Sequence, residues 1–364
     1  MRQFKILFIF FMTFFLISCG NKLEAIKIDN SEAASVKGDT SEPAAPEPAS
    51  TPAPAPAPAP VPQPVPNTGT NPTNAKGDFT KVPGATANLI YENDAESGRL
   101  MPKESYYDGG TRFPPENYVS NIMGVSGDVA RNGNKSWFFR MNKADWVNNP
   151  RIPEGYHPRC HISKLNDVNG RMIQDQEYWL GWSIYFPKDY VVEKTPRAGT
   201  VLMEFKGVGG SNIMFPLSLS LDIDNDGVQR YGFFSRRDGE YQNGWTQSWL
   251  YHWGDNVFPP KGVWIDYVVR LNISLKSTGY IEIWERVNGG TLKKVTSYNG
   301  VTTYWGSDGK PPKSSDYWYM VYGDYKAKIA KLPVTAPDNT TYYDEFRVAK
   351  GSGGGILVDP EEYK

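Results

Sequence analysis

Large apolar residues alternate with smaller or polar ones along residues 178–186, which read Tyr-Trp-Leu-Gly-Trp-Ser-Ile-Tyr-Phe. A period of two is typical of a β-strand that separates two environments. The face expected to pack in a core carries Tyr178, Leu180, Trp182, Ile184 and Phe186. The other face mixes rings with small hydrogen-bonding groups, as a sugar-binding floor would, and carries Trp179, Gly181, Ser183 and Tyr185.

The same alternation recurs in later segments that turn residues separate. The clearest is residues 264–274, whose apolar face consists of Ile265, Tyr267, Val269, Leu271 and Ile273. Residues 280–285 alternate again after a turn-forming run, so the two segments are expected to form a hairpin. Further strands are expected at 217–222, 317–326 and 342–348. Many antiparallel strands in one large domain predict an all-β fold, a two-sheet antiparallel sandwich.

Residues 200–206 form another alternating segment. Its two faces are expected to carry Val201, Met203 and Phe205 on one side and Leu202, Glu204 and Lys206 on the other.

The start of the chain, residues 1–19, has the features of a secretory signal. Arg2 and Lys5 supply positive charge, and the apolar run 6–17 is too short to span a bilayer comfortably. Cys19 follows Leu-Ile-Ser, which resembles the bacterial lipobox and implies that Cys19 is lipidated and anchors the protein to a lipid bilayer of the cell envelope. No aspartate directly follows Cys19, which favours the outer membrane over the inner one. A plain signal peptide or an uncleaved anchor is the alternative.

Residues 20–77 have no periodic apolar pattern and contain Ala-Pro repeats between Pro43 and Pro66. They predict a disordered linker in extended polyproline II form, which would act as a semi-rigid spacer. A ligand for proline-recognising modules is the alternative. The remaining residues, 78–364, are long enough for one large all-β domain.

Charge and cysteine content exclude other classes of protein. Lys plus Arg total 39 and Asp plus Glu total 40, so the bulk basicity that nucleic-acid binding requires is missing. Only two cysteines exist, so with Cys19 lipidated Cys160 has no disulfide partner in the chain. The spacing of His157, Cys160 and His161 matches no zinc site. We expect a monomer without nucleic-acid partners.

One acidic run in the sequence could be a calcium site. Residues 222–227 read Asp-Ile-Asp-Asn-Asp-Gly, like the start of a calcium loop. An EF-hand requires Glu at the twelfth position, where this chain has Phe233. The same run is an ordinary hairpin turn, which is the favoured interpretation. No cofactor is therefore expected, with calcium as the one open alternative.

An aromatic-rich segment follows Arg236 and Arg237. It contains Trp245, Trp249, Tyr251, His252 and Trp253. Sugar faces stack on such rings, and a basic pair suits an acidic glycan. Loop residues folding over a sheet edge are the alternative.

Taken in chain order, several segments resemble the jelly-roll polysaccharide lyases related to heparin lyase I and glucuronan lyase. These segments are residues 137–140, 159–161, 178–187, 264–273, 322–326 and 343–348. The resemblance implies a concanavalin A-like β-jelly roll in which one sheet holds an acidic polysaccharide and cleaves it by β-elimination beside a uronic acid. That chemistry requires a group that neutralises the uronate carboxylate, a base for the C5 proton and an acid for the departing O4.

The resemblance also implies roles for individual residues. In the late strand the family has lysine, any residue, glycine, any residue, tyrosine and a basic residue, which Gly323, Tyr325 and Lys326 match. Tyr325 is the expected catalytic proton-transfer residue, with His161 assisting it. Substrate binding is expected from Arg159, Lys206, Lys326 and Tyr319.

The chain departs from the family pattern at chemical positions. Val321 stands where the family's late strand has lysine, and His161 stands where relatives often have glutamate after Arg159. Glu204 and Lys206 occupy a strand on which relatives tend to have glutamine and histidine. A structural role remains the alternative for Tyr325, Arg159 and His161.

Three functions therefore remain open. A lyase acting on an acidic polysaccharide is the leading hypothesis. A carbohydrate-binding surface module that has lost its chemistry is the second, and a glycoside hydrolase on a related sandwich is the third. Asp344 and Glu345 cannot flank one glycosidic bond as a hydrolase pair, because neighbours in a strand face opposite sides.

Overall fold

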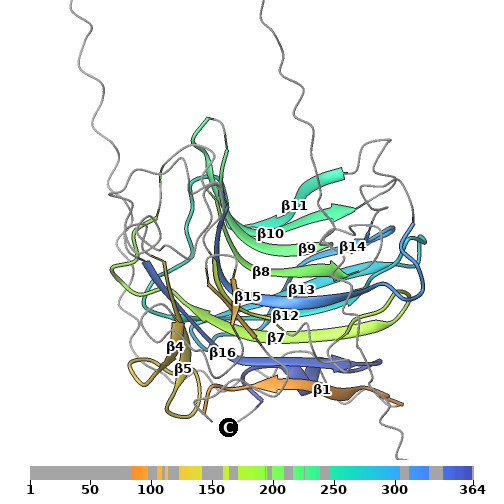
Figure 1. Ribbon diagram of the computed structural model, residues 1–364, viewed down its shortest axis with the longest axis horizontal. Coiled ribbons are helices and arrows are strands. Elements are labelled where there is room, and N and C mark those ends of the chain that lie inside the picture. Colours follow the sequence, from red (N-terminus) through yellow and green to blue (C-terminus); the bar gives the residue numbers. More distant parts are fainter. Residues whose placement is uncertain are drawn as a thin grey trace, which may run out of the picture. The chain divides into compact units, whose positions relative to one another are not determined.

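Hydrogen bonds between antiparallel strands join the described chain into two eight-stranded sheets (Figure 1). This computed structural model describes residues 84–96, 105–108, 111–113, 123–141, 159–163, 171–192, 194, 199–208, 216–224, 226–237, 246–303, 311–327 and 339–362. The all-β, two-sheet antiparallel prediction is confirmed. The predicted signal, Cys19 and the predicted linker lie outside the described residues.

The first sheet, sheet I, contains the alternating residues 178–185, which belong to β7. Its order is β14 (Lys293–Asn299), β13 (Tyr280–Val287), β12 (Trp264–Asn272), β7 (Glu177–Tyr185), β16 (Asn339–Lys350), β5 (Ser136–Met141) and β4 (Met123–Ser126), with β1 (Asn88–Asn93) also paired to β16. The predicted hairpin is confirmed, since β12 pairs with β13 from Ile265 opposite Val287 to Asn272 opposite Tyr280.

The second sheet, sheet II, contains the strands that carry the expected site residues His161, Lys206 and Tyr325. Its order is β11 (Thr246–His252), β10 (Gln229–Arg237), β9 (Leu217–Ile223), β8 (Gly199–Val208), β15 (Tyr317–Ala327), β6 (Arg159–Ser163), β2 (Ser105–Asp108) and β3 (Thr111–Phe113). A short helix, α2 (Gly355–Val358), follows β16.

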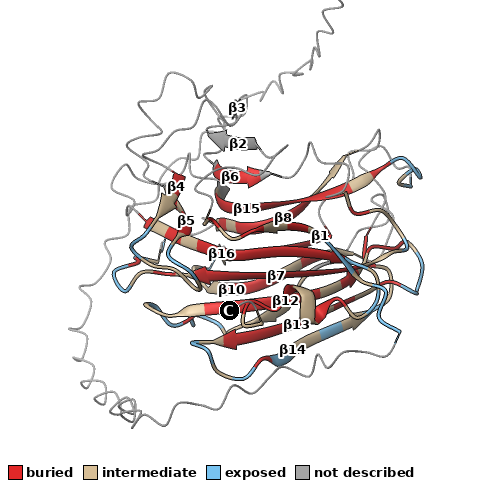
Figure 2. Ribbon diagram, turned by 90° about the horizontal axis from the view of Figure 1, so that it is seen from below, coloured by how far each residue is buried: buried red, intermediate tan, exposed pale blue. Residues whose placement is uncertain are grey.

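The core lies between the facing sides of the two sheets and is rich in rings. Trp182 of β7 lies 5.7 Å from Phe346 of β16 and 6.0 Å from Phe233 of β10, measured between ring centroids. Tyr322 of β15 stacks on Phe346 at 4.2 Å, which joins sheet II to sheet I. Figure 2 shows buried residues running along the central strands of both sheets. Burial of this much aromatic surface is the main stabilising contribution to the fold.

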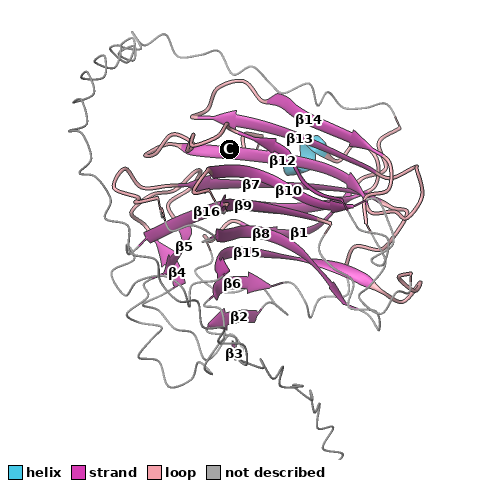
Figure 3. Cartoon of the chain, turned by 90° about the horizontal axis from the view of Figure 1, so that it is seen from above, coloured by secondary structure: helices cyan, strands magenta, loops and turns pink. Residues whose placement is uncertain are grey.

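The assignment of the faces of residues 178–186 is half right. The predicted core face is buried and belongs to the core between the sheets. The predicted sugar-binding face is wrong, because it points away from sheet II and is covered by the C-terminal segment. Trp179 is 6% exposed and stacks on Trp284, and a Cβ at Gly181 would lie 1.7 Å from the carbonyl oxygen of Val358. Figure 3 shows α2, the short helix ending at Val358, beside the strands of this sheet.

Buried charges attach the C-terminal segment to sheet I. Arg286 of β13 donates to both carboxylate oxygens of Asp359, at 2.6 and 2.9 Å, and to Asp266 of β12 at 3.1 Å. Arg131 donates to Asp266 as well and also to Glu361. Arg286 and Asp359 are each almost fully buried. The segment after β16 is therefore an integral layer of the fold.

The acidic run 222–227 belongs to the connection between β9 and β10. The Oδ1 atom of Asp224 accepts hydrogen bonds from the backbone N–H groups of Asp226 and Val228 at 2.9 Å. Its Oδ2 atom pairs with Arg230 at 3.0 Å. The described residues of this run thus form the hairpin turn that the sequence favoured.

Two further findings concern the described part of the chain as a whole. Within these residues no helix is long and apolar enough to cross a membrane. Cys160 is buried, forms no disulfide within these residues, and its thiol lies 3.7 Å from the carbonyl oxygen of Arg140.

Candidate active site

Three neighbouring strands of sheet II, β6, β15 and β8, bring most of the predicted site residues into one region. Gly323 of β15 pairs with His161 of β6, and Tyr325 pairs with Arg159. On the other side of β15, Val321 pairs with Glu204 of β8 and Tyr319 with Lys206. Paired residues of antiparallel strands share a face, so these positions share the face of sheet II that turns away from the core.

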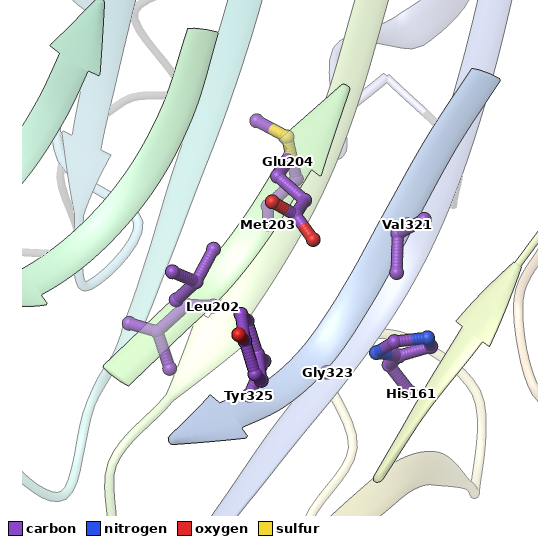
Figure 4. Close-up of a pocket in the computed structure, with 8 residues that line it drawn as sticks. His161, Leu202, Met203, Glu204, Val321, Gly323 and Tyr325 are labelled. Carbon is purple, nitrogen blue, oxygen red and sulfur yellow. The ribbon is translucent and has the colours of Figure 1, made fainter. Parts of the chain in front are cut away.

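A shallow pocket lies on this face (Figure 4). Its lining comes from β6, β8 and β15 and consists of His161, Val201, Leu202, Met203, Glu204, Val321, Gly323 and Tyr325. Figure 4 shows the side chains of Tyr325 and His161 on either side of Gly323, with Glu204 and Val321 on the next row. The pocket therefore holds two side chains able to transfer protons and one carboxylate.

Gly323 is required by the close approach of two strands. Its φ angle is +121°, and a Cβ there would lie 2.5 Å from the carbonyl oxygen of Cys160 and 2.7 Å from the Cα atom of His161. The glycine thus allows β6 to approach β15 closely, in a backbone conformation that other residues rarely adopt. This approach places His161 opposite Gly323, across that glycine from Tyr325.

A bulge between β8 and β15 also shapes the pocket. The pairing shifts between Tyr322, which lies opposite Met203, and Tyr325, which lies opposite Val201. Leu202 is consequently buried in the core cluster while Val201 is half-buried, so the predicted alternation of residues 200–206 is wrong at these two positions. Bulges re-aim side chains and are frequent next to active sites.

Lys206 and Glu204 form an ion pair beside Tyr325. The Nζ atom of Lys206 lies 3.0 Å from Oε1 of Glu204 and 5.7 Å from the centroid of the Tyr325 ring. Glu204 is 4% exposed. The lysine ammonium is thus held between a carboxylate and the ring of the predicted catalytic tyrosine.

The remaining predicted site residues are placed as follows. His161 is 2% exposed and lines the pocket, and Tyr319 is 7% exposed on the strand position paired with Lys206. Arg159 and Lys326 are placed as strand residues, opposite Tyr325 and Thr200 respectively, but their side chains lie outside the described residues. Their proposed contacts with substrate remain predictions.

Glu204 is the one charged residue that lines the described pocket, and it was not among the site residues expected from the sequence. The sequence noted it only as a departure from the family pattern. The sequence did contain a signal for Glu204, because Glu204 and Lys206 are two residues apart and therefore share the face opposite Phe205.

Two other chemical candidates lie elsewhere. Asp344 and Glu345 belong to β16 of sheet I, outside the pocket. Burial raises the pKa of the Asp344 carboxyl to about 8, although it accepts a hydrogen bond from the backbone N–H of Arg131. No group of three or more metal-ligating side chains occurs within the part of the chain that the structure describes.

Comparison with known proteins adds the family. The polysaccharide lyase family matches residues 105–347, from the first residue of β2 into β16. The chain belongs to the polysaccharide lyase family. The match includes every strand that lines the pocket of this lyase, and the resemblance noted in the sequence is confirmed. No curated protein matches the chain.

Solved structures of other lyases are similar to this one. An endo-β-1,4-glucuronan lyase from the fungus Trichoderma reesei matches with a TM-score of 0.50 and 16% identity, covering 76% of this chain and all of that one. An exolytic family 7 alginate lyase from Zobellia galactanivorans matches with a TM-score of 0.45 and 12% identity, covering 72% of this chain and 99% of that one. At these identities the likeness to the glucuronan lyase shows the fold, which is the jelly roll of the lyases.

Proposed function

We propose that this polysaccharide lyase cleaves an acidic, uronic-acid polysaccharide by β-elimination in the pocket between β6, β15 and β8. The observation that carries the proposal is the juxtaposition of Tyr325 and His161 across Gly323, with the Lys206 ammonium 5.7 Å from the tyrosine ring. Proton-transfer groups beside a cation are what the elimination needs.

The reaction proceeds in this site as follows. Lys206, with Arg159 and Lys326 as further candidates, neutralises the uronate carboxylate and so makes the C5 proton more acidic. Tyr325, assisted by His161, removes that proton, the C4–O4 bond breaks, and a C4=C5 double bond forms. The departing O4 takes a proton from the same pair of side chains. Atoms and charge balance without any other reactant.

One observation favours the second candidate function, a binding protein without catalysis. Val321 lines the pocket where the family's late strand has lysine, so one cation is missing from the pattern. Lys206 lies on the neighbouring strand and supplies a positive charge in the same region. We therefore keep β-elimination as the conclusion.

The proposal is tested by ultraviolet absorbance, because β-elimination leaves an unsaturated uronate that absorbs. Residues 78–364 are incubated with glucuronan, alginate, heparin, chondroitin and pectin, each with and without calcium. We expect absorbance to rise with one member of this panel. Binding to a member without any rise would establish the binding protein instead, and new reducing ends without a rise would establish a hydrolase.

The place of action is a separate proposal. The signal-like residues 1–19 with Cys19, followed by the proline-rich residues 20–77, support a lyase that is lipid-anchored in the bacterial cell envelope, at the outer membrane. Cys19→Ser is expected to move the protein from the membrane fraction to the soluble fraction. Unchanged membrane association would contradict the lipid anchor.

A further inference from the structure

A single row of paired residues crosses sheet II from the pocket to its edge strand. Val321 of β15 pairs with Glu204 of β8, which pairs with Ser218 of β9. Ser218 pairs with Phe234 of β10, which pairs with Trp249 of β11. Since paired residues share a face, Phe234 and Trp249 lie on the same face as the pocket. With strands about 4.8 Å apart, Trp249 is roughly 14 Å from β8.

Phe234 and Trp249 form an aromatic cluster on that face. Their ring centroids lie 5.6 Å apart in an edge-on arrangement, and His252 lies 6.0 Å from Trp249. All three residues are half-buried, whereas Phe233, the neighbour of Phe234, is fully buried in the core. The partly exposed rings therefore belong to the surface of sheet II and not to its core.

The strand between the pocket and these rings carries small side chains on this face. Ser218 and Ser220 of β9 place their hydroxyl oxygens 3.1 Å apart. Ser220 pairs with Gly232 of β10, which has no side chain. Both serines are buried, whereas the rings of Phe234 and Trp249 are partly exposed. Arg236, two residues beyond Phe234, falls on the same face and adds positive charge.

We propose that Phe234 and Trp249 form a sugar-stacking platform for the polysaccharide chain whose reacting uronate occupies the pocket. The occupant follows from continuity: the row leads from the pocket without a change of face, and a charge opposite in sign to uronate lies beside the rings. Pyranose faces are apolar and pack on aromatic rings, so partly exposed rings on this face suit a bound sugar chain. The inference rests on the proposed function, since it extends the same bound chain across the strands.

The length of the ligand provides the test. In the Tyr325→Phe protein, which by the proposed function leaves the ligand intact, calorimetry measures the affinity for glucuronan and mannuronate oligosaccharides of two and eight sugars. Trp249→Ala is expected to weaken binding of the octasaccharide about tenfold, and binding of the disaccharide less than twofold. Trp249→Phe, which keeps a ring, is expected to stay within about threefold.

The matched control is Trp264→Ala, which removes a half-buried tryptophan from sheet I. It is expected to leave both affinities unchanged. The platform would be overturned if Trp249→Ala weakened binding of both lengths equally or did not weaken binding of the octasaccharide. It would also be overturned if the Tyr325→Phe protein did not bind the octasaccharide. If only the proposed function is wrong, the result is different. The wild-type protein then gives no rise in absorbance, while Trp249→Ala still weakens binding of the octasaccharide.

Discussion

Glu204 determines the charge of the pocket, because its buried carboxylate lies 3.0 Å from the only described lysine ammonium near Tyr325. A uronate that binds Lys206 must compete with this carboxylate, and the two anions repel each other. The ion pair thus holds Lys206 in place and at the same time weakens its attraction for substrate.

Replacing Glu204 by Gln is therefore expected to lower KM two- to fivefold on the substrate that the absorbance panel identifies. The estimate takes roughly 0.5–1 kcal/mol for a partly exposed ion pair. Initial rates over a range of polysaccharide concentrations measure it. Glu282→Gln on sheet I makes the same change in net charge and should leave KM unchanged. A higher KM for Glu204→Gln would show that Glu204 itself contacts the substrate favourably.

Residue roles were the part that the sequence predicted least completely. The resemblance led to Tyr325, His161 and Lys206, which the structure brings into one region. It did not lead to Glu204 as a pocket residue, because a departure from a family pattern does not say where a side chain points. The resemblance also could not show that a glycine is needed at position 323 because β6 approaches β15 closely there.

At the scale of elements, alternation predicted the strands well, since a period of two follows directly from strand geometry. The hairpin of β12 and β13 and the strands β9, β15 and β16 lie where they were expected. Two errors arose where alternation alone does not determine the structure. Alternation separates two faces but does not reveal what covers each, so the outer face of β7 was mistaken for a binding surface. It also assumes unbroken pairing, so the bulge at Leu202 was missed.

The outer face of β7, β12 and β13 has its own ionic centre at Glu177. Its carboxylate accepts hydrogen bonds from Trp179 at 2.7 Å, from Arg270 at 2.7 Å and from Tyr280 at 2.5 Å. Burial alone would raise the pKa of Glu177, but the hydrogen bonds from Arg270, Tyr280 and Trp179 outweigh it, so the pKa is lowered from its ordinary value of 4.5. The ionised form therefore stabilises these strands.

Glu177→Gln is expected to lower the free energy of unfolding by about 1 kcal/mol at pH 7. Because the pKa of Glu177 is lowered in the folded state, its ionised form contributes stability above pH 4.5. This contribution is lost as the pH falls through the folded-state pKa, so the difference in unfolding free energy between Glu177→Gln and wild type should shrink in acid. Urea unfolding of the two proteins at pH 7 and at pH 3 measures this difference. A difference that grows towards acid would contradict this assignment.

Across the whole molecule, the two sheets have different tasks. The described pocket and the aromatic platform lie on sheet II, whereas the buried ion pairs that attach the C-terminal segment lie on sheet I. Changes to sheet I should therefore alter stability with little effect on substrate binding.

Asp359→Asn tests this division. It leaves Arg286 and Arg131 with Asp266 as a shared partner, so the variant is expected to lose roughly 3–5 kcal/mol of stability, the usual cost of breaking a buried ion pair. KM of the folded fraction should not change. Asp255→Asn, which breaks an exposed pair with Arg230, serves as control and should unfold like wild type. A changed KM for Asp359→Asn would show that the sheets are coupled.

The catalytic role of Tyr325 is tested most directly by comparing the absorbance rate of Tyr325→Phe with that of Tyr317→Phe, a variant of another tyrosine on the same strand. Both changes remove one hydroxyl and keep the ring. We expect Tyr325→Phe to lose at least a hundredfold in turnover while binding the polysaccharide as wild type does, and Tyr317→Phe to stay active. If Tyr325→Phe retains turnover, or loses it together with affinity and folding, Tyr325 is not the catalytic residue.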